Sequence, residues 1–290
     1  MSLEIRTTLR GSKREVIIGR GLPTVIIGER INPTGRKRLA TALLAGDMSL
    51  VQKEALSQVE AGASVIDINV GVAGIDEAKI LMAAVEATSQ VVDVPLSLDS
   101  ADPAALEAAL EVCPGKPLIN SVNGEEHSLA RILPLVRGRK AAVIGLTMDE
   151  DGIPTDPERR LRIAEKILHR AEEHGIPRED VIIDCIATAV SVDQRAAKVT
   201  LETMRRVIEE FGVNLTLGAS NVSFGLPGRI TINSAFLAMA LAAGLTCPIL
   251  DPTQPEIRET ILASDLLLGL DEWAMRYIAH SRASKGKRSG

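Results

Sequence analysis

The sequence predicts an α/β fold, a TIM (β/α)8 barrel preceded by a short N-terminal β-hairpin. Three observations predict it. The chain has 290 residues, a length typical of one such barrel. About eight short apolar runs alternate with helical patterns along the chain. The runs are apolar almost throughout, as expected when the barrel interior and the outer helices bury both faces of each strand.

The elements follow in order. Two strand-like runs on either side of Gly11 predict the hairpin, within residues 1–22. The eight barrel strands are then expected in TVIIGERI (24–31), SVIDINV (64–70), VPLSLDS (94–100), PLINSVN (117–123), AAVIGLTM (141–148), VIIDCIA (181–187), LTLGASNVS (215–223) and CPILD (247–251). Between them, Asp102-Pro103 and Asp156-Pro157 each place a capping residue before a proline that starts a helix.

We expect one domain over residues 1–280 and a flexible basic tail over 281–290, where SRASKGKRSG is basic and rich in small residues. A doubly wound open sheet is the competing architecture. The barrel is favoured because the first strand is not followed by a glycine-rich phosphate loop and because the strand count matches closure.

Composition excludes several classes of function. A net charge of −5 with 2% aromatic residues does not suit a nucleic-acid-binding surface. The most apolar segment, 235–250, is interrupted by Gly244, Thr246 and Pro248, and the N-terminus lacks the apolar stretch of a signal peptide, so neither membrane insertion nor secretion is expected. The cysteines, Cys113, Cys185 and Cys247, are widely spaced, which indicates a reducing, cytoplasmic setting.

Acids and amides follow the apolar part of most predicted strands. They are Glu29, Asp67, Asn69, Asp99, Asn120, Asn123, Asp184, Asn221 and Asp251. The carboxyl ends of the strands of a TIM barrel converge on one face, so these side chains are expected to line a single cup. One such residue could simply cap the next helix, but six or more together are not explained by capping. Carboxylates and amides suit a ring that carries N–H donors and a carbonyl.

Other chemistries fit the sequence less well. Paired acids could hold a divalent cation, but amides alternate with the acids, and the four histidines, His127, His169, His174 and His280, lie in helical or loop positions. Cys185 could act as a nucleophile; a small barrel residue beside a ligand-binding carboxylate is the favoured interpretation. An aldolase or lyase barrel would require a Schiff-base lysine or a metal site, and lysines are scarce at the strand ends.

Taken together, the sequence segments at the strand ends resemble those of the pterin-binding methyltransferases, which exchange methyl groups between tetrahydrofolate and corrinoid proteins. They also resemble those of the folate module of cobalamin-dependent methionine synthase. The resemblance runs from about Val25 to the last helix, and its segments are IGERIN (27–32), DINVG (67–71), LSLDS (96–100), LINS (118–121), IGLTMDEDGIP (144–154), IID (182–184), SNVSFGLP (220–227) and INSAFLAMA (232–240). Cys185 and Phe224 depart from part of the family. The S-T-R-P-G type loop of dihydropteroate synthase is absent, because NVGVAGID follows the second barrel strand.

The resemblance implies a role for each site residue. Asp99, Asn120 and Asp184 would hold the edge of the pterin ring, and Asn221 would lie near N5 as the catalytic residue. The remaining positions would line the same cavity or lie near the folate: Glu29, Asp67, Gly218, Ser220 and Arg229. Tetrahydrofolate or methyltetrahydrofolate would be the substrate, and a separate corrinoid protein would carry the cobalamin, so the chain itself would need no metal. The resemblance also implies a homodimer.

Two directions of transfer remain open at this point. Methyl transfer from a corrinoid protein to tetrahydrofolate, in the catabolism of a methylamine or a betaine, is slightly preferred. Transfer from methyltetrahydrofolate to a corrinoid iron-sulfur protein in one-carbon fixation is the alternative. A folate carrier or sensor without catalytic activity would bind the same ligand.

Overall fold

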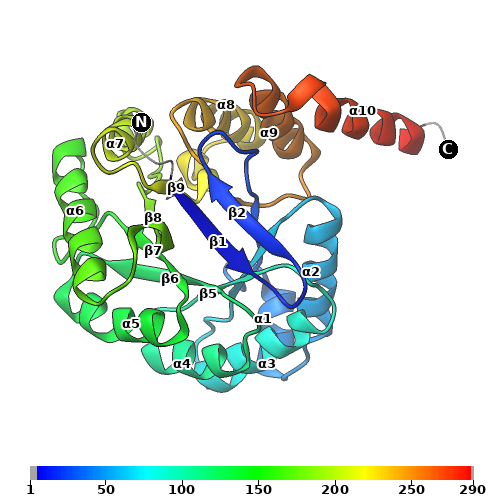
Figure 1. The fold of residues 1–290 in the computed structure, drawn as a ribbon. Coiled ribbons are helices and arrows are strands. Elements are labelled where there is room, and N and C mark those ends of the chain that lie inside the picture. The colour runs from blue at the N-terminus through cyan, green and yellow to red at the C-terminus, as the bar shows by residue number, and fades with distance from the viewer. Residues whose placement is uncertain (1–4, 289–290) are drawn as a thin grey trace.

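The computed structural model describes the backbone of residues 5–288 and the side chains of residues 5–283. The chain opens with an antiparallel hairpin of β1 (Arg6–Arg10) and β2 (Glu15–Gly19), in which Leu9 pairs with Val16. This confirms the predicted hairpin; residues 1–4 of its predicted segment lie outside the described residues. Figure 1 shows the hairpin lying across one end of the barrel.

Eight parallel strands form the barrel predicted from the sequence. Their sheet order is β10-β3-β4-β5-β6-β7-β8-β9, and a bridge between Gly218 and Ile249 joins the two outer strands, where Ile249 N–H donates to Leu217 O at 3.0 Å. The strands are β3 (Ile27–Ile31), β4 (Val65–Asn69), β5 (Leu96–Asp99), β6 (Leu118–Asn123), β7 (Ala142–Leu146), β8 (Val181–Asp184), β9 (Asn214–Thr216) and β10 (Ile249–Leu250).

Helices surround the barrel (Figure 1). Asp102 and Asp156 cap their helices as predicted, accepting hydrogen bonds from the backbone N–H groups of Ala104 and Arg159. The helices are α1 (Lys37–Leu44), α2 (Ser49–Glu60), α3 (Glu77–Ser89), α4 (Pro103–Val112), α5 (Glu126–Arg139), α6 (Pro157–Glu173), α7 (Ala196–Phe211), α8 (Arg229–Ala242), α9 (Pro255–Leu267) and α10 (Met275–Arg288), with 3-10 turns η1 (Arg178–Asp180), η2 (Ala219–Ser223) and η3 (Glu272–Ala274).

The hairpin closes the amino end of the barrel. Leu9 and Ile18 are fully buried in one cluster with inward-facing strand residues such as Ile27 and Ile144. Asn214, at the start of β9, donates its side-chain amide to Thr7 Oγ1 at 3.0 Å and to Ile18 O at 3.1 Å. Because apolar packing and buried hydrogen bonds seal this end, the open face of the barrel is the carboxyl end of the strands.

Two segments differ from the sequence prediction. The predicted strand 215–223 is a strand only as far as Thr216, and η2 begins at Ala219, because Ser220 and Asn221 favour turn conformations over a ladder. The predicted flexible tail is instead helical as far as Arg288, since α10 continues through it; its alanine, lysine and arginine residues are good helix formers. Residues 289–290 of that tail lie outside the described residues.

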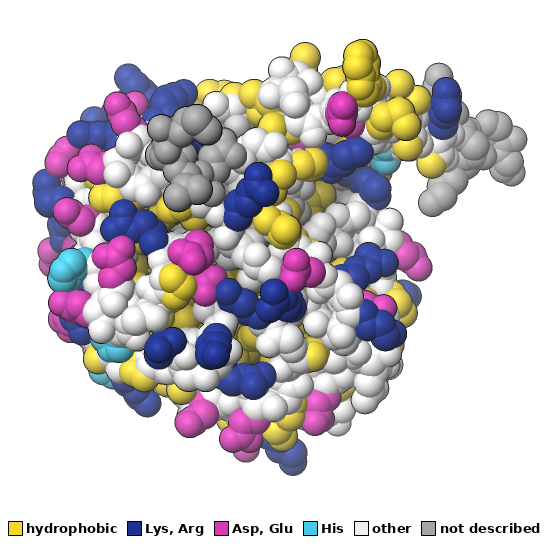
Figure 2. All heavy atoms as spheres, in the orientation of Figure 1, with side chains coloured by type: hydrophobic (Ala, Val, Ile, Leu, Met, Phe, Trp, Pro, Cys, Tyr) yellow, Lys and Arg dark blue, Asp and Glu magenta, His cyan; other side chains and the backbone are white. Residues whose placement is uncertain are grey.

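The molecular surface separates charged from apolar regions. Over the hairpin end, basic and acidic side chains are interspersed (Figure 2). Apolar side chains gather along the upper edge of this view, over α9 to α10, where Leu267, Trp273 and Met275 are exposed. Within the described part of the chain, none of the helices has the length and apolar character needed to cross a membrane.

Candidate functional site

Strand register brings the predicted acids and amides of β4, β5 and β6 side by side. Asn69 and Asp99 end β4 and β5 and pair with each other, and Asp99 also pairs with Asn120, which lies in the middle of the longer strand β6. Two strands further round, Asp184 ends β8 and pairs with Leu146. The cup predicted from the sequence therefore exists along this arc of the barrel.

Asp67, which is buried, and Asp99, which is partly exposed, form a pair of neighbouring carboxyls. The side-chain amide of Asn120 donates to Asp67 Oδ1 at 3.2 Å. Burial raises the pKa of Asp67 well above its usual range, and the charge of Asp99 raises it further. Burial also raises the pKa of Asp99, whereas a hydrogen bond from Asn69 lowers it. The raised pKa values favour the protonated form of each carboxyl relative to a solvent-exposed aspartate, and a protonated carboxyl can donate a hydrogen bond as well as accept one.

Asp184 is a separate buried acceptor. Its side chain is only 7% exposed, and its Oδ1 accepts a hydrogen bond from Ile186 N–H at 2.6 Å. Burial raises the pKa of this carboxyl to about 7, against the opposing effects of the Ile186 hydrogen bond and the positive charge of Arg160. Asp184 is therefore poised to change its charge around neutral pH.

Glu29 links the end of β3 to η2. Ser220 Oγ donates to Glu29 Oε1 at 3.3 Å. Burial and the charge of Asp251 raise the pKa of Glu29 to about 7, and the Ser220 hydrogen bond lowers it. Arg30 points to Asp251 and to Glu54, with Nη1 at 3.1 Å from Asp251 Oδ2 and Nε at 3.2 Å from Glu54 Oε2. This side of the cup thus holds a second acid with a raised pKa.

The 3-10 turn η2 presents Asn221 at the rim. Asn221 is exposed, and among the described residues its side-chain amide has no hydrogen-bond partner. A Cβ atom added at Gly218 would lie 2.9 Å from Asn221 Nδ2, so the amide lies directly over this glycine. Arg229 braces the turn, donating through Nε to Ser223 Oγ at 2.9 Å and through Nη2 to Ser220 O at 2.8 Å. The turn therefore holds a free amide in a defined place.

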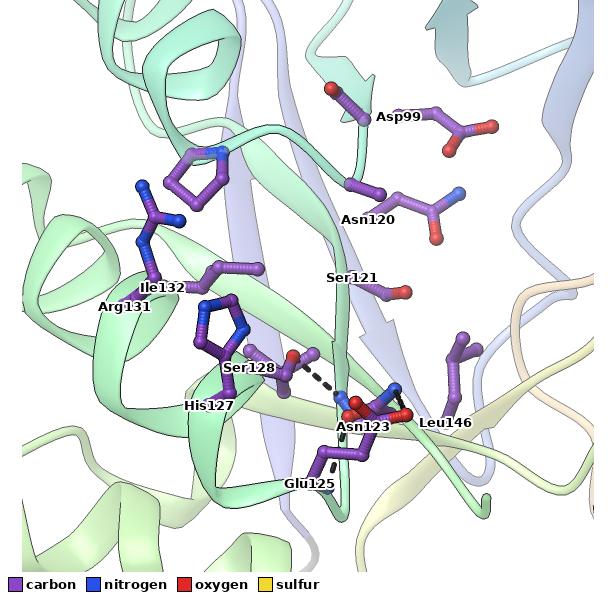
Figure 3. A pocket seen from close by; sticks show the side chains of 14 residues that line it. Asp99, Asn120, Ser121, Asn123, Glu125, His127, Ser128, Arg131, Ile132 and Leu146 are labelled. Atoms are coloured by element: carbon purple, nitrogen blue, oxygen red, sulfur yellow. Dashed lines mark hydrogen bonds between the residues drawn. The ribbon is translucent and has the colours of Figure 1, made fainter. Parts of the chain in front are cut away.

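A cavity of about 370 Å³ opens beside the Asp99 and Asn120 side chains. Figure 3 shows these two residues and Ser121 on its strand side, and His127 and Arg131 of α5 on the opposite side. This volume lies within the range of small-molecule sites. The other predicted site residues do not line this cavity: Glu29, Asp67, Asp184, Gly218, Ser220, Asn221 and Arg229.

Three arginines near the cup were not predicted. Arg30 directly follows Glu29 in β3, and its position in a strand-end segment could have indicated it. Arg131 lies one turn into α5 and Arg160 lies in the first turn of α6, so neither falls at a strand end, where the sequence pattern pointed. The positions of Arg131 and Arg160 near the cup depend on how α5 and α6 pack against the barrel.

Cys185 does not have the properties of a nucleophile. Its side chain is buried, and burial with the neighbouring charge of Asp184 raises the pKa of the thiol far above its usual range. A thiol needs a lowered pKa to react as a thiolate. The sulfur atom accordingly packs as a small apolar group.

The fold and the cup define a class of protein, a TIM barrel whose carboxyl face carries a group of carboxylates and amides. The chain belongs to the family of pterin binding enzymes, whose sequence profile matches residues 28–251. This confirms the resemblance predicted from the strand ends.

Two curated relatives agree with this assignment, and solved structures share the fold. The chain is 30% identical over 269 residues to the methylcorrinoid:tetrahydrofolate methyltransferase of Eubacterium limosum, covering 90% of this chain and 97% of that protein. It is 32% identical over 238 residues to the methionine synthase of Mycobacterium tuberculosis, covering 78% of this chain but only 20% of that enzyme. Dihydropteroate synthases from Yersinia pestis and Stenotrophomonas maltophilia share the fold, with TM-scores of 0.67 and 0.66, at 18% and 17% identity and over 91% and 90% of this chain, or 99% and 98% of theirs.

Proposed function

We propose that this chain transfers a methyl group between the cobalt of a corrinoid protein and N5 of tetrahydrofolate, in the direction that forms methyltetrahydrofolate. The observation that carries the proposal is the nearly end-to-end match, at 30% identity, to a methylcorrinoid:tetrahydrofolate methyltransferase. The methionine synthase match supports methyl transfer as the reaction type. The carboxylates and amides of the cup support a pterin as the ligand.

The residues present fit a pterin ring. The amino group and ring N–H groups of a pterin are donors, and its carbonyl and ring nitrogens are acceptors. Asp99, Asn120 and Asp184 supply the complementary groups: acceptors on the carboxylates, and both kinds on the amide. Asp99 and Asp184 end their strands and Asn120 lies within β6, so the barrel frame fixes their relative positions. In this proposal Asp67 supports Asn120, and Glu29 and Ser220 line the opposite side.

The transfer itself is a displacement at the methyl carbon. The N5 lone pair forms the new C–N bond while the C–Co bond breaks, and both electrons of that bond stay on cobalt as cob(I)alamin. Nitrogen becomes positively charged and then releases its proton to solvent. We assign Asn221 to this step: its free amide oxygen accepts a hydrogen bond from N5–H more strongly as positive charge develops, which lowers the barrier.

The corrinoid partner and the source of the methyl group belong to the same proposal. A corrinoid protein would bring methylated cobalt to the open carboxyl face, because the hairpin fills the other end. The methyl group would come from catabolism of a methylamine or a betaine. The alternative is transfer from methyltetrahydrofolate to a corrinoid iron-sulfur protein, and a folate carrier without turnover is the alternative of another class.

Two further features are proposed. The three cysteines are unpaired and buried, which supports a reducing, cytoplasmic compartment. Exposed apolar side chains at Leu267, Trp273 and Met275 support a homodimer, since contiguous exposed apolar surface often marks an interface. Light scattering of the purified protein would give twice the monomer mass if it is a dimer.

The proposal is tested by mixing the protein anaerobically with methylcobalamin and tetrahydrofolate and recording the visible spectrum. The wild type should produce the cob(I)alamin band, and Asn221→Ala should slow its appearance by about 30- to 1000-fold, equivalent to losing one transition-state hydrogen bond. Gln90→Ala, which removes an exposed amide at the C-terminal end of α3 and outside the predicted site, serves as the control. Tight folate binding with no methyl transfer in either direction would favour the carrier.

A further inference from the structure

Arg160 is a buried cation without an acidic partner. Its side chain is 2% exposed and is the largest of the fully buried side chains in the described part of the chain. No ion pair joins it to a described carboxylate; its donors point instead to backbone carbonyls, with Nε at 2.8 Å from Pro154 O and Nη1 at 2.6 Å from Cys185 O and 2.8 Å from Ile186 O. Burying a charge is unfavourable, so a cation in this place calls for an explanation.

The segment that Arg160 holds is strained. Ile186, two residues after Asp184, has a φ of 50°, a left-handed conformation that is rare for a β-branched residue. Its carbonyl accepts from Arg160 Nη1 and from Thr200 Oγ1, the latter at 3.0 Å, while its N–H donates to Asp184 Oδ1. The same residue is therefore tied to Arg160 on one side and to the site carboxylate on the other.

Arg160 is the positive charge that acts on the Asp184 carboxylate. Three titratable groups interact electrostatically with this carboxyl: Arg160 from α6, the thiol of Cys185 directly after β8, and the thiol of Cys247 two residues before β10. Burial raises the pKa of both thiols, so they are uncharged. Arg160 is the only cation of the three, and it opposes the effect of burial on Asp184.

We propose that Arg160 is a positioning residue, which holds the Asp184 carboxylate charged and oriented to accept the N–H donors at the edge of the pterin ring. The inference rests on the proposed function for the identity of the ligand. Arg160 acts through Asp184 and the Ile186 loop and does not itself touch the pterin. An uncharged Asp184 would carry its own proton toward the ring donors and lose one acceptor.

The test combines two measurements on the full chain with Arg160→Gln, Arg160→Lys and the control Arg162→Gln, an exposed arginine of the same helix. NMR titration of ¹³C-labelled aspartate in the ligand-free protein gives the pH midpoint at which the Asp184 carboxyl ionises. Calorimetry with tetrahydrofolate between pH 6 and 9 gives the affinity.

The Arg160→Gln midpoint should rise by about one pH unit or more, since a shift of one unit is a tenfold change in ionisation. Affinity at pH 7.5 should fall about threefold or more, because a midpoint raised from about 7 to about 8 lowers the ionised fraction of Asp184 by about that factor, and the deficit should shrink toward pH 9 as Asp184 ionises. Arg160→Lys keeps the charge, so its midpoint should stay within about half a unit of wild type. Arg162→Gln should change neither quantity.

Other results would overturn the inference. An unchanged midpoint in Arg160→Gln, or an affinity deficit equal at every pH, would give Arg160 a purely structural role. If Arg160→Gln does not fold, Arg160→Lys decides, because a midpoint raised by about a full unit there would contradict charge control. Failure of the wild type to bind tetrahydrofolate would overturn the proposed function, while the ligand-free midpoint would still report on Arg160.

Discussion

Gly218→Ala should reduce methyl transfer while leaving the fold intact. Gly218 has a φ of −73° and a ψ of 87°, which alanine tolerates, so its backbone does not demand glycine. The added Cβ, however, would lie 2.9 Å from Asn221 Nδ2. Non-bonded heavy atoms prefer about 3.5 to 4.0 Å, so the amide must move by about 0.5 Å or more.

The size of the effect follows from that displacement. A misplacement of about 1 Å can lower a rate by about 100-fold, so a shift of about half that distance should reduce kcat by about 10- to 100-fold, or roughly 1.4 to 2.7 kcal/mol. Because the atom that must move is the end of a flexible exposed side chain, the melting temperature should change by only about 2 °C or less.

The assay is single-turnover methyl transfer from methylcobalamin to tetrahydrofolate, with tetrahydrofolate affinity measured separately. Gly138→Ala is the matched control, since an added Cβ there meets no atom within 4 Å and the residue lies in α5. Full activity in Gly218→Ala would refute the placement of Asn221 at N5. Loss of affinity and rate together, with a lowered melting temperature, would indicate general damage to η2 instead.

Three further predictions concern the same cup. Asp99→Asn should weaken tetrahydrofolate binding, measured by calorimetry, by about 10- to 100-fold, because a ring donor would be left without an acceptor; equal affinity would remove Asp99 from the site. Asp184→Asn should raise the melting temperature at pH 8 more than at pH 5. Folding raises the Asp184 pKa from 3.8 to about 7, so the native state binds this proton more tightly; the resulting destabilisation, on the order of 4 kcal/mol, is complete above pH 7 and disappears as the pH falls toward 4. Tetrahydrofolate affinity of the wild type should fall as the pH drops through about 7, where Asp184 and Glu29 gain protons; a flat profile from pH 8 to 6 would contradict this.

The barrel and its polar cup could be predicted because the pattern that encodes them is local. Most of the predicted barrel strands are short apolar runs that lead into an acid or amide, and parallel strands bring their carboxyl ends together on one face. The positions of Asp99 and Asp184 on strand ends follow directly, whereas β6 continues past Asn120 to Asn123. The caps at Asp102 and Asp156 are equally local, since cap and helix start are adjacent in the chain.

The parts that escaped prediction depend on contacts between distant segments. Arg160 lies on a helix face that reads as an ordinary amphipathic pattern, and only the approach of the loop after β8 buries it. The pKa values of Glu29 and Asp184 also follow from burial in the folded barrel. The end of β9 at Thr216 was missed because apolar Leu217 and Ala219 continue the strand-like pattern into η2.

The account is tested most directly by following the methyl group itself. Methylcobalamin labelled with ¹³C in its methyl group is incubated anaerobically with the protein and tetrahydrofolate, and the product is analysed by NMR. The account predicts that the label appears on N5 of methyltetrahydrofolate, in step with cob(I)alamin formation, and that Asn221→Ala slows both equally. Two results together would contradict methyl transfer: the label stays on cobalt while tetrahydrofolate binds, and in the reverse experiment no methyl group passes from methyltetrahydrofolate to cob(I)alamin.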